Sequence, residues 1–125
     1  MIEMTNVSKK YIKHSALKDI SLTLPIGKII GVVGENGSGK STLLRLISGL
    51  SLPTSGKVTV NGETANRRIS SIVSYLSEFG SHYHIFTVRE AMDFQSSQYT
   101  DFNMAKAEEI MKFMKLEPDM KIKNL

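Results

Sequence analysis

The chain has 125 residues, of which 41% are apolar, and this length and apolar content suffice to bury the core of one domain. No run of about 18 apolar residues could span a membrane, and the N-terminal residues lack the apolar stretch of a secretory signal, so we expect a cytoplasmic protein. The absence of cysteine excludes disulfides and thiolate metal sites. The net charge is +4, and basic residues cluster near the N-terminus: Lys9, Lys10, Lys13, His14 and Lys18. Such a cluster could bind nucleic acid, an anionic membrane or a phosphorylated ligand, or it could simply face solvent.

The first predicted elements are two strands and a helix. Residues 20–24, ISLTL, alternate apolar with polar side chains, which predicts a half-buried strand. Residues 28–33, KIIGVV, form a nearly unbroken apolar run, which is typical of a strand buried on both faces. A helix is expected after a glycine-rich loop, because KSTLLRLISGL places four apolar residues at helical spacing before the stop signals Gly49 and Pro53. Those four residues are Leu43, Leu44, Ile47 and Leu50.

Two further strands are predicted after this helix. Residues 57–60, KVTV, alternate as a short strand does, and Asn61-Gly62 is a strong hairpin signal. Residues 71–76, SIVSYL, predict another core strand. The N-terminal part should therefore combine antiparallel hairpins with a buried central strand.

Helices are predicted toward the end of the chain. Thr87 and Glu90 have the spacing of a capping box, so a helix should begin at Val88 and run to about Ser96. A second helix should begin near Asn103 and end before the proline at 118. Its apolar face would either fill the core or form an adaptable docking surface rich in methionine. That face consists of Met104, Ala107, Ile110, Met111 and Met114.

The most informative stretch is GENGSGKST, residues 34–42, which matches the phosphate-binding pattern G-x-x-x-x-G-K-[ST]. Its glycines let backbone N–H groups surround a phosphate, Lys40 would reach the β- and γ-phosphates, and Ser41 would bind Mg²⁺. A chance match is expected in roughly half a percent of chains of this length, and the flanking strand and helix signals favour a site over a structural glycine turn. The expected nucleotide contacts here are Gly34, Glu35, Asn36, Gly37, Ser38, Gly39, Lys40, Ser41 and Thr42.

Residues 2–60, which include KKYIKHSALKDISLTLPIGKIIGVVGENGSGKSTLLRLISGL, closely resemble the ATP-binding cassette (ABC) family. The resemblance implies an α/β fold: a P-loop NTPase-type core with an N-terminal antiparallel β subdomain and the start of a helical subdomain. Residues 1–86 would belong to the core, and residues 87–125, beginning near FTVREAMDF, would open the helical subdomain where transporter subunits dock. The implied ligands are ATP and Mg²⁺.

The same resemblance gives roles to two residues outside the loop. Tyr11 stands where the family has an aromatic residue that stacks on adenine, whereas by itself it would be a half-exposed strand tyrosine. Glu78 stands where the family has a glutamine that helps to coordinate Mg²⁺ and links the site to the transmembrane partner, whereas by itself it would be a surface loop glutamate. A carboxylate keeps an oxygen for Mg²⁺ but adds charge and loses the amide donor. The expected catalytic residues are Lys40 and Glu78, and the expected metal ligands are Ser41 and Glu78.

Three motifs that the family carries further along do not occur in this sequence: the signature, the acidic strand with the catalytic glutamate, and the switch histidine. We therefore expect a truncated chain, corresponding to the N-terminal half of the subunit and inactive as an ATPase by itself, with apolar surface around residues 28–33 partly uncovered.

The resemblance implies a function in the complete protein, which would couple ATP hydrolysis to membrane transport. It would work at the inner face of the cell membrane with a transmembrane subunit and a second ATP-binding subunit, and no nucleic acid is expected. The alternatives are a non-transport ABC-type ATPase acting on nucleic acid or ribosomes, and a non-catalytic interaction module that depends on nucleotide.

Overall fold

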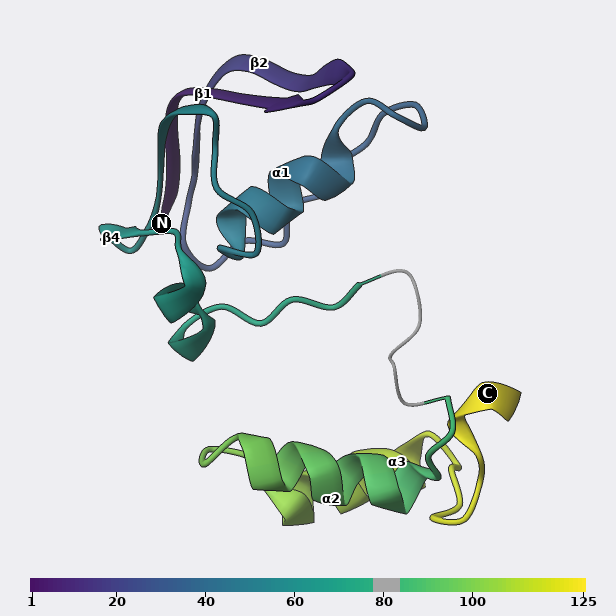
Figure 1. Ribbon diagram of the computed structural model, residues 1–125. Helices are drawn as coiled ribbons and strands as arrows, with labels where there is room; N and C mark the ends of the chain where they lie inside the picture. The colour runs from purple at the N-terminus through teal and green to yellow at the C-terminus, as the bar shows by residue number, and fades with distance from the viewer. Residues whose placement is uncertain (78–83) are drawn as a thin grey trace. The chain divides into compact units, whose positions relative to one another are not determined.

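A computed structural model describes residues 1–77 and 84–125, which divide into two units, Met1–Leu76 and Ser77–Leu125. The first unit contains strands β1 to β4, helix α1 and the short 3₁₀ helix η1, and the second contains helices α2 and α3 and the 3₁₀ helix η2 (Figure 1). In chain order the elements of the first unit are β1 (Ile2–Tyr11), β2 (His14–Leu24), α1 (Lys40–Ile47), β3 (Ser55–Val60), β4 (Glu63–Thr64) and η1 (Arg67–Ser71). Those of the second unit are α2 (Val88–Gln98), α3 (Met104–Phe113) and η2 (Ile122–Asn124).

The four strands of the first unit form one antiparallel sheet in the order β2-β1-β3-β4. The alternation predicted for residues 20–24 is confirmed, because Ile20, Leu22 and Leu24 are half-buried while the residues between them are exposed. The hairpin predicted at Asn61-Gly62 is also confirmed, since it joins β3 to β4 and both residues have the positive φ that this tight turn requires.

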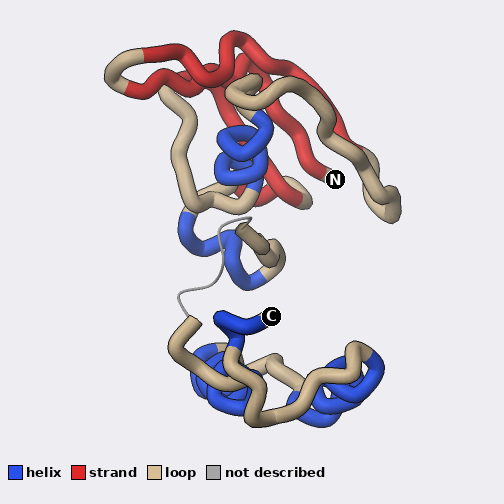
Figure 2. The backbone as a smooth tube through the Cα atoms, turned by 90° about the vertical axis from the view of Figure 1, so that its right-hand side faces the viewer, coloured by secondary structure: helices blue, strands red, loops and turns tan. Residues whose placement is uncertain are grey.

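The core of the first unit lies between the sheet and α1, which Figure 2 shows alongside the strands. On α1, Leu46 and Ile47 are buried and Leu44 is 44% exposed, and Leu50, beyond the end of the helix, is 64% exposed. The predicted apolar face is thus only partly right, because the helix ends at Ile47 and the chain turns away before Leu50. The buried residues of this core are Met4, Val7, Leu46, Ile47, Val58, Val60, Ala65 and Ile69.

The predictions of two strands, over residues 28–33 and 71–76, are wrong. Residues 28–33 have no regular structure, and Ile29 and Val33 are almost wholly exposed, at 104% and 93%. Of residues 71–76, Ser71 is the last residue of η1 and the others are irregular chain, with Leu76 exposed. In the part of the chain that the structure describes, neither segment pairs with a strand, and without a ladder partner the backbone N–H and C=O groups of a strand stay in water. The expected exposure of apolar surface around residues 28–33 is observed.

Both helices predicted for the second unit are confirmed. At the start of α2 the Thr87 hydroxyl accepts from Glu90 N at 3.2 Å, and Glu90 Oε2 accepts from Thr87 N at 2.7 Å, which completes the capping box. Two hydrogen bonds to the Glu90 carboxylate lower its pKa: chiefly the one from Thr87 N, and then the one from the Thr87 hydroxyl at 3.1 Å. Asn103 caps α3 by accepting from Lys106 N. Arg89 on α2 forms an ion pair with Glu108 on α3, with 2.9 Å between Nη1 and Oε1, and this pair connects the two helices.

No helix among the residues described is long and apolar enough to cross a membrane.

Candidate functional site

The predicted phosphate loop leads directly into α1, and its shape depends on two glycines. Gly37 and Gly39 have φ values of +85° and +96°, in the left-handed region that side chains disfavour. Gly37 lies in a turn over residues 35–38, which Ser38 N closes by donating to Glu35 O at 3.2 Å, and Gly39 follows this turn. Gly39, a fixed glycine of the motif, and Gly37, at one of its variable positions, are therefore needed for the backbone path.

Gly39 also fixes the loop against the sheet. A Cβ at this position would lie 2.6 Å from Ala16 O and 2.8 Å from a methyl group of Leu17, both on β2. Only a residue without a side chain allows so close an approach of two backbone segments. The loop is consequently seated on the β1–β2 hairpin.

Lys40, the first residue of α1, reaches back across the loop. Its Nζ donates to Gly34 O and to Glu35 O, each at 2.8 Å, and the residue is half-buried. An ammonium has three donors, so a third N–H is left for an anion next to the loop. The positive charge is thereby held within the loop, where a phosphate would lie.

The N-terminus of α1 strengthens the same positive region. Its N-cap, Gly39, supplies no side-chain cap, and the first turn of this helix holds no acidic residue. The positive end of the helix dipole is therefore not neutralised by side chains of its own first turn. The side chain of Ser41 is exposed and that of Thr42 is half-buried in this turn. The N-terminus of α1 therefore combines backbone N–H groups, the helix dipole, the Lys40 ammonium and the hydroxyls of Ser41 and Thr42. This combination suits a nucleotide phosphate with Mg²⁺.

Tyr11 lies at the tip of the hairpin on which the loop is seated. It pairs across the tip with His14, and their ring centroids are 5.5 Å apart at an interplanar angle of 31°. The side chain is 40% exposed, so part of the ring is open to a ligand. The structure thus brings the predicted stacking residue and the phosphate loop to one hairpin, Tyr11 at its tip and Gly39 against Ala16.

A further residue near Tyr11 was missed by the sequence reasoning. The Nζ of Lys9 lies 5.3 Å from the centroid of the Tyr11 ring and donates to Leu52 O at 2.7 Å. In the sequence Lys9 is one of five clustered basic residues, and nothing there separates it from its neighbours. Glu78, the other predicted residue outside the loop, lies outside the described residues.

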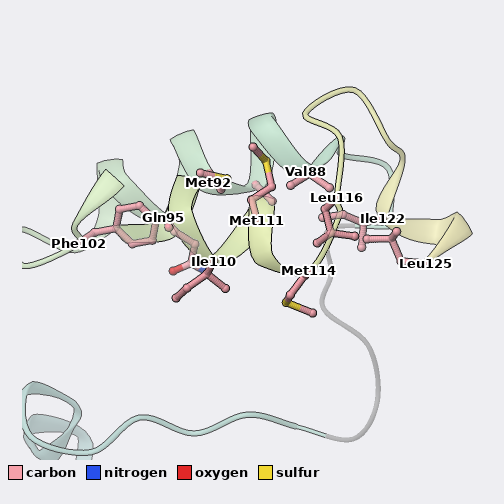
Figure 3. A pocket seen from close by; sticks show the side chains of 12 residues that line it. Val88, Met92, Gln95, Phe102, Ile110, Met111, Met114, Leu116, Ile122 and Leu125 are labelled. Atoms are coloured by element: carbon pink, nitrogen blue, oxygen red, sulfur yellow. The ribbon is translucent and has the colours of Figure 1, made fainter. Parts of the chain in front are cut away.

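The second unit contains an apolar cavity of about 410 Å³ between α2, α3 and the C-terminal residues (Figure 3). Met111 is buried there, as core filling requires, whereas Met114 also lines the cavity but is 60% exposed. The methionines of the predicted apolar face are thus divided between core and surface. The cavity is lined by Val88, Met92, Phe102, Ile110, Met111 and Met114, among others.

Comparison with known proteins identifies the family. The family model described as ABC transporter matches residues 17–124. The ABC transporter ATP-binding protein YtrB of Bacillus subtilis (strain 168) is 31% identical over 127 aligned residues, which cover 100% of this chain and 44% of YtrB. An uncharacterized ABC transporter ATP-binding protein of the same organism, YybJ, is 49% identical over 70 residues, which cover 56% of this chain and 32% of YybJ. The chain spans less than half the length of these two relatives.

The fold agrees with this identification. The dimeric ATP-binding cassette MJ0796, whose structure represents a post-hydrolysis state bound to ADP and phosphate, matches with a TM-score of 0.82 and 25% identity. The match covers 100% of this chain and 63% of that chain. The predicted fold class, a P-loop NTPase-type core with an N-terminal antiparallel β subdomain, is confirmed by this likeness. The chain belongs to the ABC transporter family, as part of an ATP-binding subunit.

Proposed function

We propose that residues 34–42 bind the phosphates of ATP together with Mg²⁺, and that the full-length protein hydrolyses ATP to drive transport across a membrane. The observation that carries this proposal is the position of Lys40, whose ammonium is held by Gly34 O and Glu35 O at the N-terminus of α1. A cation fixed beside free helix N–H groups is suited to the β- and γ-phosphates.

Each group in the site has a separate task in this proposal. Backbone N–H groups of the loop bind phosphate oxygens, Lys40 neutralises charge on the β- and γ-phosphates, and Tyr11 stacks on the base. The hydroxyl of Ser41 and the carboxylate of Glu78 are the proposed protein ligands of the metal. Bound Mg²⁺ would supply charge neutralisation between the phosphates. Lys40 and Glu78 are also the residues that we propose to act in catalysis.

The partners follow from the family and from the names of the relatives. We propose that the protein works with a transmembrane subunit and a second ATP-binding subunit at the inner face of the cell membrane. The cassette MJ0796 is dimeric in its solved structure, and the curated relatives are named as ATP-binding proteins of ABC transporters. In this proposal residues 1–86 belong to the ATP-binding core and residues 87–125 begin the helical subdomain that docks on the membrane partner.

A nucleotide titration on the full-length protein tests the proposal. ATP and inorganic tripolyphosphate should compete for one Mg²⁺-dependent site, because both carry the phosphates that the loop and Lys40 contact. AMP should bind at least about 100-fold more weakly than ATP, since it lacks two phosphates and their charge-assisted hydrogen bonds. Equal affinity for AMP and ATP would contradict a site built for the β- and γ-phosphates.

The 125-residue chain by itself should bind ATP at best weakly and should not hydrolyse it. Phosphoryl transfer to water needs a phosphate cradle, a metal held from two sides and a residue that orients the water, and this sequence supplies the cradle and Ser41. A phosphate-release assay on the purified chain, with Lys40→Ala as the control for contaminating ATPases, measures this. Turnover that depends on Lys40 at about 1 s⁻¹ or faster would show that the chain is catalytically sufficient.

Glu78 is proposed to lie within reach of the metal, and the isosteric variant Glu78→Gln tests this in the full-length protein. The exchange replaces an anionic oxygen with a neutral amide of the same length, so turnover should require a higher Mg²⁺ concentration. The measurement is the ATPase rate as a function of Mg²⁺ and of Mn²⁺. The matched control is Glu63→Gln, on the exposed strand β4. Identical metal dependence in the wild type and in Glu78→Gln would contradict the role of Glu78 as a metal ligand.

A further inference from the structure

Two neighbouring lysines on β1 have different surroundings. Lys9 is half-buried, and its Nζ donates to Leu52 O at 2.7 Å and lies 5.3 Å from the centroid of the Tyr11 ring. Lys10 is exposed and lines a polar pocket with residues such as Ser8 and Lys18. The basic cluster of the sequence therefore contains one lysine with a defined structural contact to the proposed base-binding residue.

We propose that Lys9 is a positioning residue for base recognition: it fixes the Tyr11 ring relative to the phosphate loop. This inference rests on the proposed function, because it concerns the nucleotide that residues 34–42 would bind. Lys9 does not contact the phosphates in this proposal and acts on the base through Tyr11.

The position of the hydrogen bond between Lys9 and Leu52 supports this role. Leu52 lies five residues after the end of α1, the helix that begins at Lys40 in the phosphate loop. The hydrogen bond from Lys9 to Leu52 O therefore connects the strand that carries Tyr11 with the segment between α1 and β3, which follows the helix that begins in the phosphate loop. A nucleotide that contacts both the Tyr11 ring and the phosphate loop needs the two at a fixed separation. In this proposal Lys9 sets the orientation of the Tyr11 ring.

Two more hydrogen bonds brace the same stretch of β1, and both involve Thr54. Thr54 N donates to Ser8 O at 2.8 Å, and Lys10 N donates to Thr54 Oγ1 at 2.9 Å. The backbone on either side of Lys9 is thus held independently of the Lys9 side chain. Removal of that side chain should therefore abolish its contact with the Tyr11 ring, and leave the contact of that ring with His14, without releasing the strand.

The test compares ATP with inorganic tripolyphosphate, which has the phosphates and no base, in the full-length protein. Lys9→Met should weaken ATP binding about five-fold, the loss expected for a cation–π contact and its supporting hydrogen bond, and should leave tripolyphosphate binding unchanged. Lys9→Arg should bind ATP as the wild type does, because a guanidinium can also donate to Leu52 O and lie over an aromatic ring. Lys10→Met, which removes the same charge from the next position, is the matched control and should have no effect on either ligand.

A double-mutant cycle separates positioning from a general structural effect. If Lys9 acts through Tyr11, adding Lys9→Met to Tyr11→Ala should cause no further loss of ATP affinity. Additive losses, wild-type ATP affinity in Lys9→Met, or an equal loss of tripolyphosphate binding would each overturn the inference. Failure of the wild-type protein to bind tripolyphosphate would instead overturn the proposed phosphate site, and the inference with it.

Discussion

Replacing Lys40 with alanine should abolish tight binding of ATP and of GTP alike. The two nucleotides differ only in the base, and Lys40 lies in the loop that would hold the phosphates they share. Two of the three Nζ donors are used by Gly34 O and Glu35 O, which leaves one for phosphate. A hydrogen bond from a charged donor contributes roughly 1.5–3 kcal/mol, so its loss should weaken binding by about 10- to 100-fold. Calorimetric or fluorescence titration of the full-length variant with each nucleotide, in the presence of Mg²⁺, measures the loss.

A second charge variant controls for the change in net charge. Lys18 is an exposed lysine of β2 in the same unit, and Lys18→Ala removes one positive charge without touching the loop. It should bind both nucleotides as the wild type does. Since Lys40 also holds Gly34 O and Glu35 O, denaturant unfolding of Lys40→Ala should be measured in parallel. A folded Lys40→Ala protein with unchanged ATP affinity would show that the phosphate-loop assignment is wrong.

Elements that depend on neighbours in the sequence were predicted well from the sequence. The Asn61-Gly62 turn requires positive φ at two adjacent residues, and these are the two residue types that best tolerate it. The capping box needs only Thr87 and the glutamate three residues later, so its hydrogen bonds could be predicted from the spacing alone.

Elements that depend on distant partners were not predictable in the same way. The apolar composition of residues 28–33 indicates a strand, but a strand forms only where another strand supplies hydrogen bonds, and no described strand pairs with this segment. The same holds for residues 71–76. An apolar composition indicates that a segment could form a buried strand if neighbouring strands were present. It does not indicate whether such strands are present.

The candidate site shows the same division. The phosphate loop is a short contiguous motif, so its glycines and Lys40 could be named from the sequence. The contact of Lys9 with Leu52 joins residues 43 positions apart, and that of Gly39 with Ala16 depends on how the loop is seated on β2. No periodicity or spacing rule connects such pairs, which is why Lys9 could be identified only from the structure.

Gly39→Ala should damage both the fold and nucleotide binding, and Gly37→Ala should do so much less. Both glycines have a positive φ, so each substitution incurs the roughly 1–2 kcal/mol that an alanine costs in the left-handed region. Only at Gly39 would the new Cβ also meet a neighbour, at 2.6 Å from Ala16 O, whereas at Gly37 nothing lies within 4 Å. Such an overlap with backbone typically costs a further 1–3 kcal/mol or so, because the loop must move away from β2.

The free energy of unfolding should therefore fall by about 2–5 kcal/mol in Gly39→Ala and by about 1–2 kcal/mol in Gly37→Ala, as measured by urea titration. ATP affinity should follow the same order, because displacement of the loop from the hairpin also moves Lys40 away from Tyr11. The comparison cancels the backbone strain that both variants share and isolates the contact between the loop and β2. Equal losses in the two variants would mean that the seating of Gly39 on Ala16 contributes nothing to the site, and that the loop holds its shape through its own turns alone.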